Sequence, residues 1–333
     1  MLAKFVKHAL ITTAVLAGLA VTAIAGVLVF TAPKSPPLIA AVENANDPFG
    51  QFARELGPYS YLTARDGTKL AYRVYPGKPG GGVALLVHGS SGTALAVHGV
   101  AKTFAARGIT AYAIDLRGHG MSPGPQGRLG DVAYIGQYED DLDDMAQLIK
   151  REHPGEKRLL VGHSMGGAVI LRTAAGRNAG NFDGYLALSP FISPGTKMDR
   201  PAEGGWTVVS IPRIVVLTIL DRFGISAFDH LNVLAMAVPQ NDNQRPRFYT
   251  QALLASANLP HDWKPSVAAI HRPTRVLIGA DDELFHAEAY PAELGAVNPA
   301  IKVTVLPGLG HMHMMFDPRA LAVEADTAVE MLR

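Results

Sequence analysis

The stretch Gly162-His163-Ser164-Met165-Gly166 decides how the rest of this sequence is interpreted. The apolar run Leu159-Leu160-Val161 before it predicts a strand, and Ala168–Leu171 after it predicts the start of a helix. When a strand turns sharply into a helix and a serine lies at the corner, the serine hydroxyl is exposed outside the sheet. The turn is so tight that side chains two positions before and after the serine would collide, which accounts for both glycines. The pattern predicts that Ser164 is a nucleophile.

Strands and helices alternate around this stretch. Asp66-Gly67 lies between two patterned runs, 59–64 and 69–75, and predicts a hairpin. Further strands are predicted over 83–87, 110–114, 158–162, 184–188, 275–278 and 302–306, with helices over 96–106, 138–150 and 318–332. Continuous apolar strands separated by helices are typical of a parallel sheet that is covered on both faces.

Residues 193–264 break this alternation, because no strand is predicted in them. The run Trp206–Leu220 is apolar except for Arg213, but it is too short and too interrupted by Pro212 to span a membrane. We expect a helical cap inserted after the sixth strand. Its apolar residues either pack on the core domain or form a lid that lines an acyl pocket or touches a membrane.

The N-terminal residues 1–31 form a candidate signal or membrane segment. Lys4 and Lys7 precede the apolar run Ala9–Phe30, which at ~1.5 Å per residue can cross a ~30 Å hydrocarbon layer. A cleaved signal peptide would use Ala23-Ile24-Ala25 as its cleavage site and release a secreted protein. An uncleaved anchor is favoured because the run exceeds the usual ~7–15 residues of a signal core. The lysines predict that the catalytic domain lies outside the cytoplasm.

Composition limits the remaining classes. Residues 32–57, which include Pro33, Pro36 and Pro37, are interpreted as a linker. The net charge of +1 gives no indication of a nucleic-acid partner. The absence of cysteine excludes disulfides and thiol catalysis, and at 48% hydrophobic residues the chain can bury a large core.

A serine nucleophile needs a base that is itself oriented by a carboxylate. Gly279-Ala280-Asp281-Asp282 follows one late predicted strand, and Gly308-Leu309-Gly310-His311 follows the last. The chain order of serine, acid and histidine is that of this kind of sheet. From the residues alone, Asp281 competes with Asp282, and His313 competes with His311, which the glycine-rich turn before it favours.

The oxyanion of the reaction needs two fixed N–H donors. One is expected from Met165 and the other from Ser90, in the loop 88–92 after the third strand. We expect His88 to bond backbone in that turn rather than to act in catalysis. The pair His311 and His313 lacks a third ligand at helical spacing, so neither a metal site nor a cofactor is predicted.

Several motifs together resemble the α/β-hydrolases: Val87-His88-Gly89, Asp115-Leu116-Arg117-Gly118-His119-Gly120-Met121-Ser122, Gly162–Gly167, Gly279–Asp282 and His311. More narrowly, they resemble the monoacylglycerol lipase and lysophospholipase branch, which is often labelled serine aminopeptidase-like. The resemblance covers residues 58–333. It implies an α/β-hydrolase fold with a mostly parallel eight-stranded sheet, in which core segments 58–192 and 265–333 flank the cap 193–264.

In that branch the acid lies three residues after the glycine that ends its strand, which selects Asp282. The segment Asp115–Ser122 is a structural loop there, so it is left out of the catalytic residues.

The resulting expectation is a membrane-tethered serine ester hydrolase that acts on lipid-like acyl esters, such as monoacylglycerols or lysophospholipids, without a cofactor. Ser164, His311 and Asp282 would form its triad. Two alternative enzymes use the same triad, an aminopeptidase and a carbon–carbon bond hydrolase. The aminopeptidase would need a cap carboxylate for the substrate amine, such as Glu203, Asp221 or Asp262. A non-catalytic binding protein of the same fold is the alternative from another class.

Overall fold

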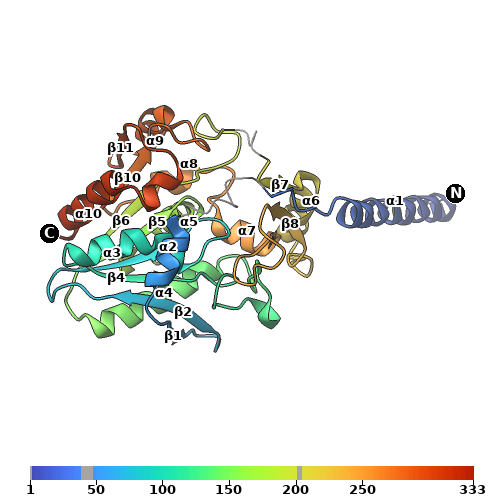
Figure 1. The fold of residues 1–333 in the computed structure, drawn as a ribbon. Helices are drawn as coiled ribbons and strands as arrows, with labels where there is room; N and C mark the ends of the chain where they lie inside the picture. The colour runs from blue at the N-terminus through green and yellow to red at the C-terminus, as the bar shows by residue number, and fades with distance from the viewer. Residues whose placement is uncertain (1, 39–47, 201–204) are drawn as a thin grey trace.

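The computed structural model describes residues 2–38, 48–200 and 205–333. An eight-stranded sheet runs through the body of the molecule in the order β1-β2-β4-β3-β5-β6-β10-β11 (Figure 1). Its strands are β1 (Ser60–Thr63), β2 (Lys69–Tyr75), β3 (Val83–Val87), β4 (Thr110–Ile114), β5 (Arg158–His163), β6 (Gly184–Leu188), β10 (Thr274–Gly279) and β11 (Lys302–Leu306). β2 pairs antiparallel with both β1 and β4, and all the other pairs are parallel. The predicted mostly parallel sheet is confirmed.

Helices cover both faces of this sheet, as its apolar strands predicted. The helices are α2 (Pro48–Glu55), α3 (His98–Ala106), α4 (Gln137–Glu152), α5 (Met165–Ala175), α7 (Gln251–Ala257), α8 (Lys264–Ala268), α9 (Tyr290–Val297) and α10 (Pro318–Leu332). Short 3-10 helices are η2 (Ala94–Val97), η3 (Pro125–Gly127), η4 (Ala179–Asn181), η5 (Ala287–Ala289) and η6 (Met312–Met315). α3 and α10 pack on one face, while α4, α5, α8 and α9 pack on the other.

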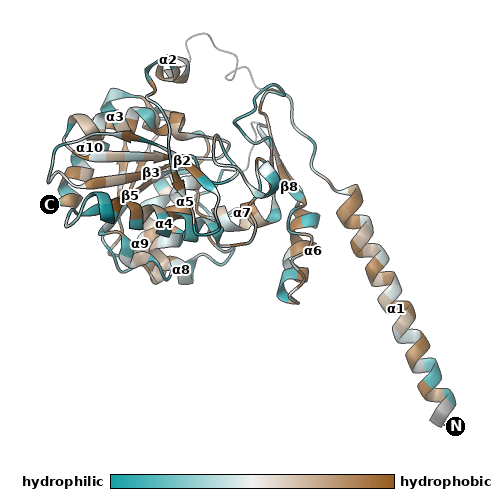
Figure 2. Cartoon of the chain, turned by 90° about the horizontal axis from the view of Figure 1, so that it is seen from below, coloured by the Kyte–Doolittle hydropathy of each residue, from teal (hydrophilic) through white to brown (hydrophobic). Residues whose placement is uncertain are grey.

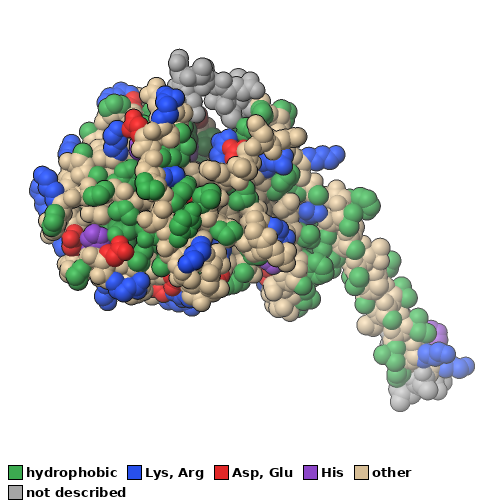
Figure 3. Space-filling view, turned by 60° about the horizontal axis from the view of Figure 1, so that its bottom comes forward, with side chains coloured by type: hydrophobic (Ala, Val, Ile, Leu, Met, Phe, Trp, Pro, Cys, Tyr) green, Lys and Arg blue, Asp and Glu red, His purple; other side chains and the backbone are tan. Residues whose placement is uncertain are grey.

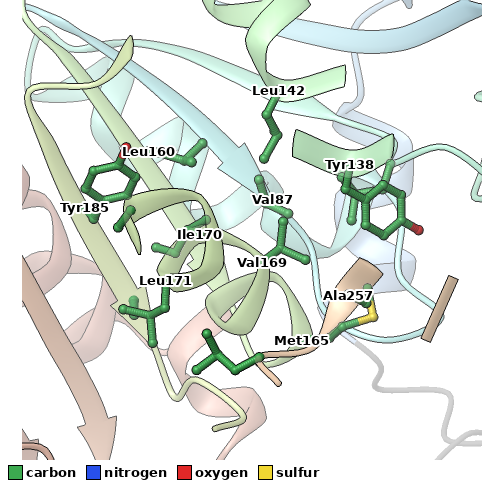
Figure 4. Close-up of a cluster of buried hydrophobic side chains, with 14 of the residues drawn as sticks. Val87, Tyr138, Leu142, Leu160, Met165, Val169, Ile170, Leu171, Tyr185 and Ala257 are labelled. Carbon is green, nitrogen blue, oxygen red and sulfur yellow. The ribbon is translucent and has the colours of Figure 1, made fainter. Parts of the chain in front are cut away.

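The larger core cluster lies beneath α4 and α5. Leu142 and Val169 of these helices face Val87 and Leu160 of the sheet (Figure 4). β3, β4 and β6 are buried at every position, because neighbouring strands and helices on both faces exclude water from them. This packing holds the carboxyl ends of the parallel strands in place, where the predicted site residues follow.

The inserted cap differs from the prediction. It contains the helix α6 (Ile211–Arg222), but also a three-stranded antiparallel sheet of β7 (Thr207–Val209), β8 (Asn232–Met236) and β9 (Phe248–Thr250). The expectation that no strand recurs between Ser193 and Lys264 is therefore wrong. Strands of three residues are too short to show an alternating pattern, and pairing with segments distant in sequence forms them.

The segment interpreted as a linker is also partly structured. Its residues 39–47 lie outside the described part of the chain, but Pro48–Glu55 forms α2. The ring of Phe52 lies 4.9 Å from that of His98, and Glu55 accepts a hydrogen bond of 2.6 Å from Lys102. This end of the segment is thus docked on α3.

The N-terminal helix α1 (Leu2–Phe30) projects from the body beside the cap (Figure 2). Its Lys4–Phe30 portion is long and apolar enough to cross a membrane, with a mean hydropathy of 2.3 in a window that is 6% buried. Leu28 is buried against Leu217 of α6 and Val233 of β8. Pro212 lies in the first turn of α6, where proline is tolerated, so it begins this helix rather than interrupting it.

Candidate active site

Ser164 lies at the corner between β5 and α5. Its φ of 54° and ψ of −118° are strained for a residue with a side chain, as expected for a serine held at such a turn. A Cβ at Gly166 would lie 2.5 Å from the carbonyl oxygens of Val87 and His88. A Cβ at Gly162 would lie 2.5 Å from the carbonyl carbon of Gly166, so neither glycine position has room for a side chain.

One acid and one histidine of the candidate pairs are in contact. His311 Nδ1 lies 2.9 Å from Asp282 Oδ2, and both side chains are buried. Because a carboxylate accepts, Nδ1 carries the proton, which leaves Nε2 as an acceptor. Nε2 is buried and has no hydrogen-bond partner among the described residues, so no bond joins it to Ser164 here.

The two competing residues point elsewhere. Asp281 is exposed, and its N–H donates to the carbonyl of Leu309. His313 Nδ1 accepts the N–H of Gly310 at 3.0 Å, which closes the turn before His311. Within the described parts of the chain, no three histidine or acidic side chains converge as a metal site would require.

Asp282 is held in its ionised form. Burial by itself would raise the pKa of this carboxyl, but the bond to His311 and the positive charge that His311 can carry outweigh burial. The N–H groups of Leu284 and Phe285 also donate to Oδ1, at 2.9 and 3.0 Å. The pKa of Asp282 therefore lies below its ordinary value, and its charge can stabilise a protonated His311.

Three further side chains position His311, and sequence reasoning missed all of them. Glu283 accepts the N–H of His311 at 2.8 Å. The His163 ring lies 4.6 Å from the His311 ring, and the Phe285 ring packs edge-on at 5.1 Å. Burial lowers the pKa of His163 to about 3, so this imidazole is neutral and donates from Nε2 to the carbonyl of His311 at 3.2 Å. His163 and Glu283 adjoin predicted site residues, but only contact shows their roles.

The two predicted oxyanion donors come from different elements. Met165 is the first residue of α5, where backbone N–H groups lack partners inside the helix. Ser90 is partly exposed in the loop after β3. His88 holds this loop, because its Nδ1 donates to the carbonyl of Gly89 at 2.8 Å and its Nε2 accepts the N–H of Leu116 at 3.1 Å. The expectation that His88 bonds backbone is confirmed.

A cap residue supports the same loop. The hydroxyl of Tyr249, in β9, accepts the N–H of Ser91 at 2.6 Å and donates to His119 Nε2 at 2.7 Å. The Ser91 hydroxyl donates to the carbonyl of Pro246, also in the cap. The cap therefore holds the residue next to Ser90. Nothing in the local sequence around Tyr249 indicates this contact.

The segment Asp115–Ser122 has structural contacts. Asp115 accepts the N–H groups of Ala94 and Met121, at 2.6 and 2.8 Å. Arg117 forms a buried ion pair of 2.6 Å with Asp141. These side chains are occupied in holding the loop.

Comparison with known proteins agrees with this arrangement. The profile of a family described as serine aminopeptidase, S33, matches residues 79–319. The chain belongs to this family. A monoacylglycerol lipase of Mycolicibacterium smegmatis is 32% identical over 38% of this chain and 44% of its own length. Human monoglyceride lipase is 30% identical over 40% of this chain and 43% of its own length. The matched stretches thus span less than half of either relative.

A solved structure shares the fold. A soluble variant of monoglyceride lipase from Saccharomyces cerevisiae superposes with a TM-score of 0.61 over 83% of this chain and 95% of its own, at 17% sequence identity. The predicted resemblance to the α/β-hydrolases and to their monoacylglycerol lipase-like branch is confirmed.

Proposed function

We propose that this protein is a carboxylic ester hydrolase that cleaves acyl esters through an acyl-enzyme on Ser164. The observation that carries the proposal is the buried bond of 2.9 Å between His311 and Asp282, which leaves Nε2 unprotonated and without a partner among the described residues. A base in this state, whose ring packs on His163 next to the strained serine corner, is what activation of a hydroxyl requires.

The mechanism follows from these contacts. Ser164 Oγ attacks the ester carbonyl carbon while its proton passes to His311 Nε2, and Asp282 stabilises the imidazolium that forms. The N–H groups of Ser90 and Met165 bind the oxyanion of the tetrahedral intermediate. Collapse of the intermediate expels the alcohol, which takes the proton from His311. Water then attacks the acyl-enzyme by the same route and releases the acid.

The proposed substrates are lipid-like esters such as monoacylglycerols or lysophospholipids. Two relatives bear the names monoacylglycerol lipase and monoglyceride lipase. Exposed apolar side chains on α6, among them Ile211, Val215 and Ile219, favour contact with lipid. Because fold and triad alone do not define a substrate, the choice of lipid-like esters rests on the relatives' names and on the apolar surface of α6.

The proposed location is the outer face of a membrane, with α1 retained as an anchor. Burial of Leu28 against α6 supports retention, since cleavage after Ala25 would leave a short stub in place of the helix that packs there. Lys4 and Lys7 support a cytoplasmic N-terminus. Carbonate extraction of membranes tests the anchor, because a cleaved protein would be recovered in the soluble fraction.

The family description favours a second candidate, an aminopeptidase. It would need a carboxylate near Ser164 to pair with the substrate amine. Of the three candidates, Glu203 lies outside the described residues and Asp262 is exposed. The side chain of Asp221 shares a hydrogen bond with that of Asp229 on the cap, so it already has a partner.

The test uses the full chain in a mild detergent and a matched Ser164→Ala variant. We expect a fluorophosphonate probe to label the parent only, and the parent to hydrolyse acetyl, octanoyl and palmitoyl p-nitrophenyl esters with a preference for the longer chains. Labelling with cleavage of aminoacyl p-nitroanilides but not of esters would favour the peptidase. Labelling without either activity would favour a carbon–carbon bond hydrolase. No labelling of folded protein would refute the nucleophile and favour a binding protein.

A further inference from the structure

A cationic cavity of about 480 Å³ lies where the cap meets the core, apart from the triad residues. Its lining includes four arginines, Arg128, Arg213, Arg245 and Arg247, and two aspartates, Asp131 and Asp242. Four positive and two negative charges leave an excess of two positive charges.

Both aspartates are already occupied. Asp131 is buried and forms a bond of 2.6 Å with Arg128, and it also accepts bonds from His230 and Thr250 at 3.0 and 2.8 Å. Asp242 forms a bond of 2.6 Å with Arg245. Each carboxylate thus neutralises one arginine, and the excess charge belongs to Arg213 and Arg247.

Arg213 is buried without a counter-ion among the described residues. The residue is 5% exposed, and its two terminal nitrogens donate to backbone carbonyls, one to Asn232 at 2.7 Å and the other to Leu28. Its Nε is buried and has no hydrogen-bond partner in the described chain. Because a buried cation is costly unless it is paired, this arrangement indicates an anion that binds beside Arg213.

Arg247 provides the second unneutralised charge. Its guanidinium lies 6.0 Å from the centre of the Phe248 ring, and no carboxylate of the described residues forms an ion pair with it. Two guanidinium groups on one cavity suit an anion with several oxygens. Phosphate is the best match, because the planar fork of arginine donates two parallel N–H bonds to it.

The position of the cavity indicates the source of the phosphate. Leu28, whose carbonyl Arg213 binds, lies in the last turn of α1, where carbonyl groups lack partners within the helix. Lys and Arg side chains lie on the body near the base of α1, as they do elsewhere on this face (Figure 3). Phe223, at the end of α6, is an 80% exposed aromatic side chain of the cap. If α1 crosses a bilayer, the cavity lies at the depth of the lipid headgroups.

We infer that the cavity around Arg213 and Arg247 is a binding site for the phosphate group of a membrane lipid. The lipid source rests on the proposed anchor, whereas the phosphate chemistry rests on the cavity alone. Bound phosphate would neutralise the excess charge and hydrogen-bond the unpartnered Nε of Arg213.

The test is calorimetric titration of the full chain in maltoside micelles with three probes: dioleoyl phosphatidic acid, dioleoylglycerol and inorganic phosphate. We expect saturable binding of phosphatidic acid, none of dioleoylglycerol, and weaker binding of inorganic phosphate. Arg247→Gln should weaken phosphatidic acid binding by about ten-fold, since it removes charge-assisted hydrogen bonds. Arg247→Lys should lose part of this affinity, because it keeps the charge but not the fork.

Arg151→Gln is the matched control, since Arg151 is exposed at the end of α4 and its loss changes the net charge equally. An equal loss in Arg151→Gln and Arg247→Gln would overturn the site in favour of non-specific attraction, and so would equal binding of dioleoylglycerol. Inorganic phosphate that binds as tightly as phosphatidic acid would uphold the phosphate site and overturn the lipid source. All titrations use the Ser164→Ala background, which cannot form the proposed acyl-enzyme with the lipid probes, so failure of the site and failure of the proposed activity are distinguishable.

Discussion

Tyr249→Phe tests whether the cap supports the oxyanion loop. The variant removes one buried hydroxyl and keeps the ring. That hydroxyl serves two buried groups, the N–H of Ser91 and Nε2 of His119, at 2.6 and 2.7 Å, and it also shares a hydrogen bond with the side chain of Ser90. Each buried polar group left without a partner costs about 1–3 kcal/mol, so the free energy of unfolding should fall by about 2–6 kcal/mol.

The same change should reduce kcat more than it raises KM. Ser91 adjoins Ser90, whose N–H is proposed to bind the oxyanion, and that interaction forms only in the transition state. Complete removal of an oxyanion donor costs about 10²–10³ in kcat. Because Tyr249→Phe loosens the donor rather than removing it, we expect a loss of about ten-fold.

Tyr185→Phe is the matched control. Its buried hydroxyl makes one bond of 3.0 Å, to the carbonyl of Ala179, away from the elbow. This variant should lose about 1 kcal/mol of stability and keep its kcat. Thermal unfolding and octanoyl ester hydrolysis would be measured on both full-length variants. If Tyr249→Phe matched Tyr185→Phe in both assays, the reasoning about the loop would be refuted.

Three further predictions concern the site and the core. Asp282→Asn should lower kcat by about 10³–10⁴ because it disturbs the imidazole tautomer, whereas the kcat of Asp281→Asn should stay within about two-fold of the parent's. Equal effects of the two variants on ester hydrolysis would contradict the assignment of Asp282 as the acid. Glu324 is fully buried with no partner for either oxygen among the described residues, and burial raises the pKa of its carboxyl well above the ordinary value. The contribution of Glu324 to stability is therefore complete below the unfolded pKa of about 4.3 and is lost as pH rises through the folded pKa. Glu324→Gln should flatten the decline in unfolding free energy above about pH 5. Parallel curves of unfolding free energy against pH for the parent and the variant would refute this. Gly166→Ala should abolish the folded, probe-labelled state because its Cβ has no room. In the control Gly295→Ala, in α9, the new Cβ meets no described atom within 4 Å, so this variant should retain labelling and gain about 0.5–1 kcal/mol in the free energy of unfolding. Full labelling of Gly166→Ala would show that the elbow tolerates a side chain.

The main sheet could be predicted from the sequence because its strands are buried on both faces. β3, β4, β6 and β11 begin and end at the predicted residues, as does α10. A strand inside a covered parallel sheet has to be apolar at nearly every position, and the residues after it have to turn. The elbow could be predicted because the crowding at Gly162 is local: a Cβ there would lie 2.5 Å from the carbonyl carbon of Gly166, only four residues away.

The cap could not be predicted in the same way. Its strands β7 and β9 are three residues long and owe their formation to pairing with β8. The docking of α2 on α3 likewise depends on contacts between segments more than forty residues apart, such as that between Phe52 and His98. Contacts of this kind leave no periodic pattern in either segment.

Local sequence also leaves side-chain direction open. Asp281 and Asp282 are adjacent and chemically identical, and only the fold turns one toward His311 and the other toward solvent. The hydroxyl of Tyr249 reaches Ser91 across 158 positions of the chain. Residue type and spacing therefore predicted the sheet, the elbow and the order of the candidate triad. Tertiary structure decided which acid contacts the histidine and which cap residue holds the oxyanion loop, because those contacts depend on where separate segments meet in space.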